Sequence, residues 1–304
     1  MSVGKWSLLR ADRLPHNLAE ADRHCNDKYT EGGVPAGYAD THRTMNYYAA
    51  LHTDIGIKKK TNQDSALILE ADTEKGKVLL ACICDGMGGL AKGEVASAAL
   101  ISAYTDWFYY ELPKLLYTSF DSESIRNSME KILFDMNIKI MDYGKKCGVN
   151  LGTTAVAMLI ADGKYYISTV GDSRSYLISD NLYQLTKDHT LMQREIDMGR
   201  LTREEAAVHP QRNVLLQCIG ASDFIVPDFF EGQALPGYQF MLCSDGFRHL
   251  ITPEEFYEKL RADKNPDFNT IRQALVDLTE LNKSRFEDDN ITSLVIRIGE
   301  NNDQ

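Results

Sequence analysis

The sequence predicts an α+β protein in which sheet strands and helices are arranged in layers. Three observations predict it: the order of the elements along the chain, the near-continuous hydrophobicity of some strands, and the amphipathic spacing of the helices. The order is strands, two helices, strands, two helices and a final strand. This is neither a βαβ alternation nor an all-β pattern, and a layered α+β sandwich fits it best.

Six runs rich in apolar and β-branched residues predict the strands. They cover residues 64–71, 77–84, 153–161, 164–178, 238–243 and 291–298. Between two of these runs stand Ala161, Asp162 and Gly163, which are typical of a tight hairpin turn. We therefore expect antiparallel pairing on either side of this turn.

Four amphipathic patterns predict helices. They lie at 94–111, at 125–143 with Gly144 or Gly148 near the end, at 253–260 and at 271–281. Thr252, Pro253 and Glu255 provide an N-cap, a first-position proline and a capping-box glutamate for the third helix. Residues 190–213 form a polar, helical excursion with a second capping box at Thr202 and Glu205, and we expect a surface insertion there.

Composition and charge exclude several classes of protein. The 304 residues are 43% hydrophobic and 25% charged, which is typical of a globular protein, and the net charge of −11 argues against a general nucleic-acid binder. The longest apolar stretches are too short to span a membrane, and the N-terminus lacks the apolar core of a signal peptide. The six cysteines form no CxxC pair, so a reduced, cytoplasmic protein is expected.

Aspartates recur where the predicted strands begin or end. Asp85, Asp172 and Asp245 follow three apolar runs, and Asp64 and Asp289 precede two others. Any one of them alone is more typical of a turn residue. Five at sheet margins indicate a shared role, because converging carboxylates need a cation between them and oxygen ligands suit Mg²⁺ or Mn²⁺.

The glycine-rich segment GMGGLAKGE after Asp85 does not have the spacing of a nucleotide-binding loop. Ala91 and Gly93 stand where that loop requires Gly and Ser or Thr. We interpret the glycines as allowing the backbone to approach an ion, with the carbonyl of Gly86 as a ligand. The seven histidines form no recognisable pair with a nucleophile, and His189 is expected to make local hydrogen bonds.

Eight short motifs match one protein family in the order in which they occur. They are TNQDS (61–65), DGMGG with GEVAS (85–97), GTT (152–154), VGDSR (170–174), LTKDH (185–189), NVLLQCIG (213–220), CSDG (243–246) and DNIT (289–292). Over roughly residues 47–298 the chain resembles the metal-dependent serine/threonine protein phosphatases (the PPM or type 2C family), in their compact bacterial form. The resemblance implies a four-layer α-β-β-α sandwich with two central antiparallel sheets and a metal cluster at one edge.

The resemblance also implies a set of metal ligands. Asp85 is expected to bridge two Mn²⁺ or Mg²⁺ ions, the carbonyl of Gly86 to bind one of them, and Asp245 and Asp289 to complete the other. Asp172 and Asp245 are expected to share a third, weaker ion.

Two positions depart from the family pattern. Gln63 and Asp64 match an acidic pair, but the family often has Glu where Gln63 stands, so a weakened contribution through a metal-bound water is expected. Lys59 replaces the family's phosphate-binding arginine and offers a point charge rather than a planar fork. The alternative for Lys59 is that Lys58, Lys59 and Lys60 together form a solvated basic turn.

These residues imply hydrolysis of phosphoserine and phosphothreonine in proteins by a water that bridges two metal ions. The expected partners are phosphorylated proteins and a cognate Ser/Thr kinase, with no nucleic acid and no membrane span, and a monomer is expected. Two alternatives stay open: a catalytically weak phosphatase-like module that binds phosphoproteins as a regulator, and an acidic structural protein that binds Ca²⁺. The expected phosphatase domain is 45–299, with 190–213 as its flap, 1–44 as an N-terminal extension and 300–304 as a polar tail.

Overall fold

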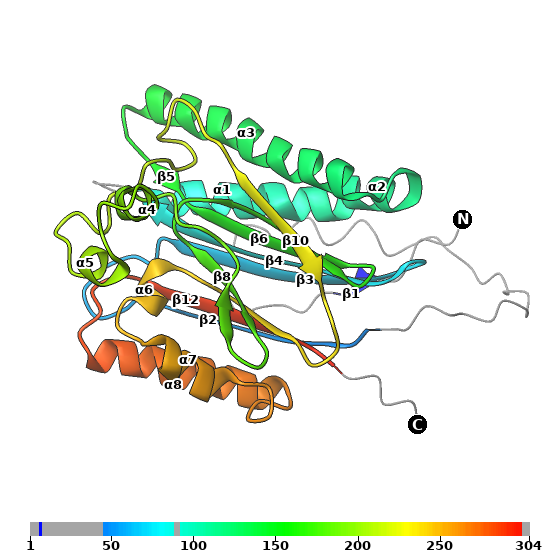
Figure 1. Cartoon of the computed structure of the whole chain (residues 1–304). Coiled ribbons are helices and arrows are strands. Elements are labelled where there is room, and N and C mark those ends of the chain that lie inside the picture. Colours follow the sequence, from blue (N-terminus) through cyan, green and yellow to red (C-terminus); the bar gives the residue numbers. More distant parts are fainter. Residues whose placement is uncertain (1–5, 8–44, 88–91, 300–304) are drawn as a thin grey trace, which may run out of the picture.

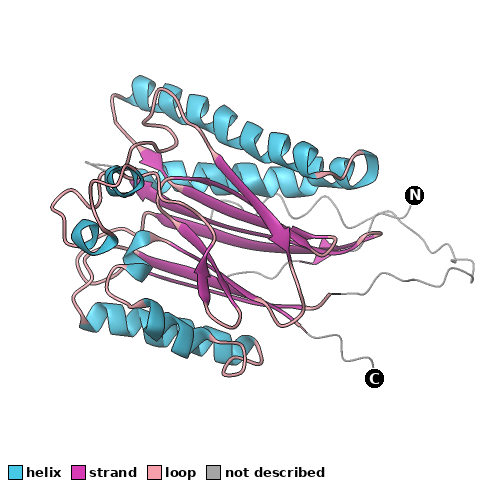
Figure 2. Cartoon of the chain, viewed as in Figure 1, coloured by secondary structure: helices cyan, strands magenta, loops and turns pink. Residues whose placement is uncertain are grey.

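Two antiparallel sheets pack face to face, and helices cover both outer faces (Figures 1 and 2). The structure is a computed structural model that describes residues 6–7, 45–87 and 92–299. The larger sheet has the order β1-β3-β4-β6-β7-β10, with β5 paired to β4, and the smaller sheet has the order β2-β12-β11-β8-β9. The four-layer sandwich implied by the sequence is therefore confirmed.

The larger sheet contains β1 (Trp6–Ser7), β3 (Asp64–Thr73), β4 (Gly76–Met87), β5 (Gly152–Thr153), β6 (Ala155–Ala161), β7 (Lys164–Val170) and β10 (Asp228–Gln233). The smaller sheet contains β2 (Tyr47–Asp54), β8 (Arg174–Ile178), β9 (Leu182–Gln184), β11 (Gln239–Cys243) and β12 (Ile291–Ile298). Between β6 and β7, Asp162 and Gly163 have φ values of 50° and 71°, as a two-residue hairpin turn requires. The hairpin expected at this turn is confirmed.

Helices flank the two sheets on opposite sides. The larger sheet is covered by α1 (Gly93–Asp106), the π-helical turn η3 (Trp107–Glu111), α2 (Leu112–Thr118) and α3 (Ser122–Cys147), and the smaller one by α7 (Pro253–Leu260) and α8 (Phe268–Ser284) (Figure 1). The described chain also has three short helices, α4 (Leu191–Asp197), α5 (Arg203–Ala207) and α6 (Asp245–Arg248). Both predicted capping boxes form, at Thr252 and at Thr202, and α3 ends at Gly148 in the left-handed conformation.

Three apolar layers hold the sandwich together, and strand β4 contributes to two of them. Because side chains alternate along a strand, Cys82 and Cys84 face the helices with Tyr104, while Leu79 and Ile83 face the other sheet. The two cysteines therefore share one face of β4. A third layer lies between the smaller sheet and helices α7 and α8.

One expectation about the elements is wrong: residues 164–178 form two strands in different sheets, because the chain turns sharply at Gly171, whose φ is 104°. The helix expected at 94–111 is present, as α1 followed by a π-helical turn, and it continues further than expected, into α2. Strands β2, β9 and β10 were not expected at all.

The two ends of the polar excursion at 190–213 lie next to each other. Leu191 N donates to Val214 O at 2.9 Å, and Thr190 and Leu215 form an isolated bridge. Within the expected N-terminal extension, Trp6–Ser7 pairs with β3, and its other residues lie outside the described part of the chain. No described helix combines the length and apolar character that crossing a membrane requires.

Candidate active site

Both sheets bring the five predicted aspartates together at one edge of the sandwich, where the charges of the other four act on Asp85. Asp64 and Asp85 stand directly opposite each other in β3 and β4. Asp245 opens α6 immediately after β11, and Asp289 lies just before β12. Asp172 lies in the turn between β7 and β8, so each aspartate comes from a different strand or strand end.

Burial and the neighbouring charges raise the pKa of three carboxyl groups in this cluster. Burial, followed by the charges of Asp64, Asp245, Asp172 and Asp289, raises the pKa of Asp85 well above its usual value. Burial and its acidic neighbours raise the pKa of Asp64 to about 7 and that of Asp172 to about 6. The chain's own cations therefore do not fully neutralise the cluster.

The GTT motif fixes the backbone on which Asp85 stands. Asp85 N donates to Thr154 Oγ1 at 3.0 Å, Thr154 N donates to Asp85 O at 2.8 Å, and Thr153 Oγ1 donates to the same carbonyl at 3.0 Å. Thr154 Oγ1 also lies 2.8 Å from Ser173 Oγ, beside Asp172. The two threonines thus hold Asp85 and the neighbouring turn in fixed relation.

The cluster has oxygens that the protein leaves unpaired. Ser244 Oγ donates to Asp64 Oδ2 at 3.0 Å and joins the two sheets at this point. In contrast, Oδ1 of Asp64 and Oδ1 of Asp245 are buried and have no hydrogen-bond partner within the described part of the chain. Buried carboxylate oxygens without a donor are costly, and a bound cation removes that cost.

A loop at 55–63 places Lys59 against the cluster. Lys59 Nζ lies 2.6 Å from Asp289 Oδ1. The loop passes close to the backbone of Asp289 at Gly56, whose φ is 76°: a Cβ added at Gly56 would lie 2.3 Å from Asp289 O. Burial alone would lower the pKa of Lys59, but the hydrogen bond and charge of Asp289, with the charges of Asp85 and Asp245, raise it. Lys58 instead pairs with Asp288 at 2.6 Å, and both of these side chains are more than half exposed.

Asn290 holds this loop at three points. Its Nδ2 donates to Ile55 O at 2.9 Å and to Thr61 O at 3.2 Å, and its Oδ1 accepts from Gln63 N at 2.9 Å. The side chain is almost fully buried. The asparagine of the DNIT motif is therefore the residue that fixes the ends of the loop that carries Lys59.

The structure gives Gln63 and Gly86 additional roles. Gln63 Nε2 donates to Glu94 Oε2 at 3.3 Å, which places a carboxylate from α1 beside the neutral amide. A Cβ on Gly86 would lie 2.4 Å from both Gln63 O and Gly93 O. The close packing of α1 against β4 therefore requires a glycine at position 86. This requirement is separate from the ion binding by its carbonyl that the sequence suggested.

Sequence reasoning missed the basic residues that lie behind Asp172 and Asp245. Arg248 Nη2 lies 3.2 Å from Asp172 Oδ2, and His249 Nε2 lies 3.4 Å from Asp245 Oδ2. Glu287 Oε2 lies 3.5 Å from His249 Nδ1, and it raises the pKa of His249 against the opposite effect of burial. In the sequence, the only hint of Arg248 and His249 was their place just after the CSDG motif.

The donor set fits divalent ions that keep part of their water. Among the described residues, no three His, Cys, Asp or Glu side chains already stand as the ligands of a single ion. Two of the aspartates instead pair with basic side chains: Asp289 with Lys59, and Asp245 with His249. All-oxygen donors with unpartnered Oδ1 atoms are the groups that Mg²⁺ and Mn²⁺ prefer, and Mg²⁺ commonly takes only one or two carboxylates.

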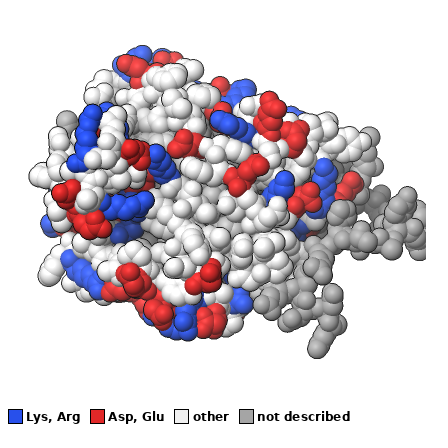
Figure 3. Space-filling view, viewed as in Figure 1, with Lys and Arg blue, Asp and Glu red and all other residues white. Residues whose placement is uncertain are grey.

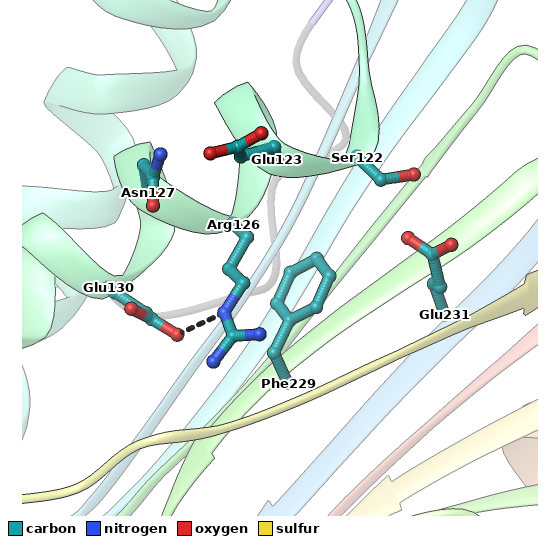
Figure 4. Close-up of a pocket in the computed structure, with 7 residues that line it drawn as sticks. All are labelled: Ser122, Glu123, Arg126, Asn127, Glu130, Phe229 and Glu231. Carbon is teal, nitrogen blue, oxygen red and sulfur yellow. Dashed lines mark hydrogen bonds and ion pairs between the residues drawn. The ribbon is translucent and has the colours of Figure 1, made fainter.

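A pocket of about 610 Å³ lies elsewhere, between the start of α3 and β10 (Figure 4). Arg126 crosses it, paired with Glu130 at 2.7 Å and positioned over the ring of Phe229. None of the predicted site residues lines it. The aspartate cluster instead lies where the strand ends of the two sheets meet.

His189 makes the local contacts expected of it. Its Nδ1 accepts from Gly171 N at 3.2 Å, and its Nε2 lies 3.1 Å from Asp228 Oδ2. Gln217 Nε2 lies 2.7 Å from Nδ1. These contacts join the base of the 190–213 excursion to the turn that carries Asp172.

Comparison with known proteins agrees with this arrangement. A family model described as "Protein phosphatase 2C" matches residues 56–214, and a serine/threonine phosphatase stp from Listeria innocua is 31% identical over 252 residues, which is 82% of this chain and 95% of the relative. The chain belongs to the protein phosphatase 2C family. As a member of this family it is a metal-dependent protein serine/threonine phosphatase.

Solved phosphatases share the fold of this family member. The Staphylococcus aureus phosphatase Stp1 superposes with a TM-score of 0.73 at 26% identity, covering 88% of this chain and 100% of the other. The catalytic domain of the phosphatase PstP, solved in complex with two manganese ions, superposes with a TM-score of 0.69 at 27% identity, covering 84% of this chain and 100% of the other. The phosphatase 2C fold thus extends beyond the matched motifs to most of the described chain.

Proposed function

We propose that this phosphatase hydrolyses phosphoserine and phosphothreonine with Mn²⁺ or Mg²⁺ held by Asp85, Asp245 and Asp289 and by the carbonyl of Gly86. One observation carries the assignment: aspartates from both sheets meet at one edge of the sandwich, and two of them have buried oxygens without a hydrogen-bond partner among the described residues. When bound, the ions polarise phosphoryl oxygens and lower the pKa of water. Carboxylates supply the negative charge and the oxygen donors that hold such ions in place.

Lys59 attracts and positions the phosphate group. Its Nζ is charged, because neighbouring carboxylates raise its pKa, and it lies on a loop that Asn290 fixes at both ends. As a point charge it neutralises a phosphoryl oxygen without the two-pronged contact of an arginine. Its link to Asp289 keeps it beside the metal ligands when no substrate is bound.

Asp64, Gln63 and Glu94 complete the site on the side of the larger sheet. Asp64 receives a hydrogen bond from Ser244 and stands opposite Asp85, so it adds negative charge near the proposed ions. Gln63 contributes a neutral amide, and its partner Glu94 places a carboxylate close by. We propose that these residues orient water around the metal ions rather than replace Asp85 or Asp289 as ligands.

The wider setting of the reaction is also proposed. The catalytic domain spans 45–299, with 190–213 as its flap, and the protein acts as a cytoplasmic monomer on phosphorylated proteins made by a cognate Ser/Thr kinase. The described cysteines are all free thiols, which supports a reducing compartment. Basic and acidic side chains are interspersed over the face in Figure 3, and the net charge of −11 does not favour nucleic acid.

The site assignment predicts loss of turnover without loss of fold. Asp85→Asn, Asp245→Asn and Asp289→Asn are each expected to lower kcat at least about a hundredfold in Mn²⁺, because each removes charge that holds an ion. EDTA is expected to abolish activity of the wild type toward p-nitrophenyl phosphate and a phosphopeptide.

Asp288→Asn is the matched control, because Asp288 neighbours Asp289 but pairs with the exposed Lys58. It is expected to keep wild-type kcat. Thermal unfolding of each variant in EDTA shows whether the fold is intact. Wild-type turnover in a folded cluster variant removes that residue from the site, and a folded wild type that never turns over supports the phosphoprotein-binding alternative.

A further inference from the structure

Asp172 lies against a buried group of charges that the proposed reaction does not use. Arg248 Nη2 donates to Asp172 O at 3.0 Å and lies 3.2 Å from Asp172 Oδ2. The same nitrogen lies 3.7 Å from Asp188 Oδ2. The side chains of Arg248 and Asp172 are 12% and 8% exposed, so this contact is shielded from solvent.

Arg174 leaves Arg248 available for Asp172. Arg174 Nε and Nη2 donate to the two carboxylate oxygens of Asp188 at 2.8 and 2.7 Å, which is the two-pronged pairing that arginine and carboxylate favour. These hydrogen bonds, with the charges of Arg248 and Arg174, lower the pKa of Asp188 even though burial opposes them. The group therefore contains two guanidinium charges that face two carboxylate charges.

The backbone holds Arg248 in this position. Arg248 is the last residue of α6, which begins at Asp245. Asn282 Nδ2 donates to Phe247 O at 2.7 Å, and the neighbouring His249 contacts Asp245 and Glu287. The hydrogen bond from Arg248 to Asp172 O adds a backbone contact that does not depend on charge. Arg248 is thus a fixed partner of Asp172 rather than a mobile surface side chain.

We propose that Arg248 is the permanent counter-ion of Asp172 and takes the place of a third divalent cation between Asp172 and Asp245. This inference rests on the proposed function, in which Asp85, Asp245 and Asp289 hold two ions. It opposes the expectation from the sequence that Asp172 and Asp245 share a further ion. The phosphatase therefore works with two divalent cations and one guanidinium at this edge.

Electrostatics and geometry both support this replacement. A divalent ion bound by Asp172 would lie about 2.0–2.6 Å from a carboxylate oxygen, and hence a few ångströms from Arg248 Nη2. Like charges repel strongly at such distances where water is scarce. Arginine cannot relieve the repulsion by losing its proton, because its guanidinium stays charged in proteins. A third ion at Asp172 must therefore either bind beside this guanidinium charge or displace it.

Counting bound Mn²⁺ tests the proposal independently of catalysis. Metal-free full-length protein is titrated with Mn²⁺ up to several millimolar, and free Mn²⁺ is followed by electron paramagnetic resonance. The wild type is expected to bind two ions. Arg248→Met, which keeps the length but removes the charge, is expected to bind a third, at a midpoint about tenfold or more above the first two. Arg248→Lys keeps the charge and is expected to bind two.

Two further variants separate the possible outcomes. Asp172→Asn in the Arg248→Met background is expected to return the count to two, because it removes the carboxylate of the new site. A wild type that binds three ions, with the third lost in Asp172→Asn, overturns the proposal. So does a folded Arg248→Met protein that binds only two.

The fold of each variant is checked by thermal unfolding. If Arg248→Met does not fold, the comparison of wild type with Asp172→Asn decides alone: two ions in both support the proposal, and a third ion lost with Asp172 overturns it. A wild type that binds fewer than two ions contradicts the proposed function, which is distinguishable from a count of three.

Discussion

At the scale of single residues, the position of Lys59 distinguishes the two interpretations of the lysine run. Lys59 contacts Asp289 and is influenced by Asp85 and Asp245, whereas Lys58 pairs with Asp288 outside the cluster. The three lysines are therefore not equivalent, as they would be in a solvated basic turn. Of the two lysines with an ion pair, Lys58 and Lys59, only Lys59 is placed to bind a phosphate at the metal site.

Lys59→Ala is expected to raise KM for a phosphopeptide about tenfold and to lower kcat less, because the lysine holds phosphate in the ground state and the transition state alike. Lys59→Arg is expected to lower KM, because two parallel hydrogen bonds replace one point contact. Steady-state kinetics with a phosphopeptide measure both. Lys58→Ala is the control and should leave KM unchanged; equal effects at 58 and 59 contradict the assignment.

Residue identity predicted the acidic half of the site better than the basic half. The aspartates were recognisable because each one ends or begins an apolar run, so their positions follow from the sheet. Arg248, His249 and Glu94 give no such signal, since their contacts join residues far apart in the sequence. Arg248 and Asp172, for example, are 76 positions apart and meet only when the smaller sheet forms.

At the scale of elements, the loop at 55–63 depends on one buried side chain. Asn290→Ala removes three hydrogen bonds to this loop and leaves two carbonyls and one N–H without their side-chain partner. It is expected to lower the free energy of unfolding by about 1–3 kcal/mol. Because the loop carries Lys59, KM for a phosphopeptide is expected to rise as well.

Asn265→Ala is a matched control for this loop. Asn265 is equally buried, and its Nδ2 donates to Lys259 O at 2.9 Å and to Arg261 O at 3.0 Å, after helix α7. It is expected to lower stability without changing KM. Denaturant unfolding and phosphopeptide kinetics on both variants make the comparison, and a KM that is unchanged in Asn290→Ala disproves the positioning role.

Elements with clear local signals were predictable, and elements defined by tertiary pairing were not. The hairpin at Asp162 and Gly163 and the capping boxes at Thr202 and Thr252 follow from local chemistry. Residues 164–178 were expected to form one strand because most of them are apolar or β-branched. Their division between two sheets depends on the turn at Gly171. β10 is hard to recognise because its burial is only partial.

At the scale of the whole molecule, the aspartate cluster makes the stability of the ion-free protein depend on pH. The folded-state pKa of Asp64 is about 7, raised from 3.8 by burial and by Asp245 and Asp289. A raised carboxyl pKa means that the folded protein binds more protons than the unfolded chain. Its contribution to stability is therefore present below about pH 4 and is lost as pH rises to 7.

Comparison with Asp64→Asn isolates this effect from other titrating groups. In EDTA at pH 4, where the Asp64 carboxyl is protonated in the folded protein and its contribution is largely intact, the wild type and the variant are expected to unfold at similar temperatures. At pH 8 the wild type is expected to unfold a few degrees lower, because it alone carries the additional charge. Mn²⁺ at pH 8 is expected to raise the melting temperature of the wild type. A difference between the two proteins that is independent of pH contradicts this explanation.

The N-terminal residues are expected to be dispensable for the chemistry. Strand β1 pairs with Glu70 and Ala71, near the end of β3 opposite to Asp64. At about 3.3 Å per residue this contact lies roughly 20 Å from the cluster. Deleting residues 1–44 is expected to leave kcat and KM for p-nitrophenyl phosphate unchanged, with circular dichroism as the check of folding. Loss of turnover in a folded protein would place part of this segment in the site.

The position of β12 determines when the enzyme becomes active during its synthesis. β12 is the last strand of the described sequence, yet it lies inside the smaller sheet between β2 and β11. Asp289 and Asn290 are synthesised just before β12, and long after the loop at 55–63 to which Asn290 is hydrogen-bonded. Domains emerge from their N-terminal end, so β2 and β11 lack their shared neighbour until β12 has been synthesised. A newly made phosphatase therefore remains inactive toward its substrates until β12 is inserted.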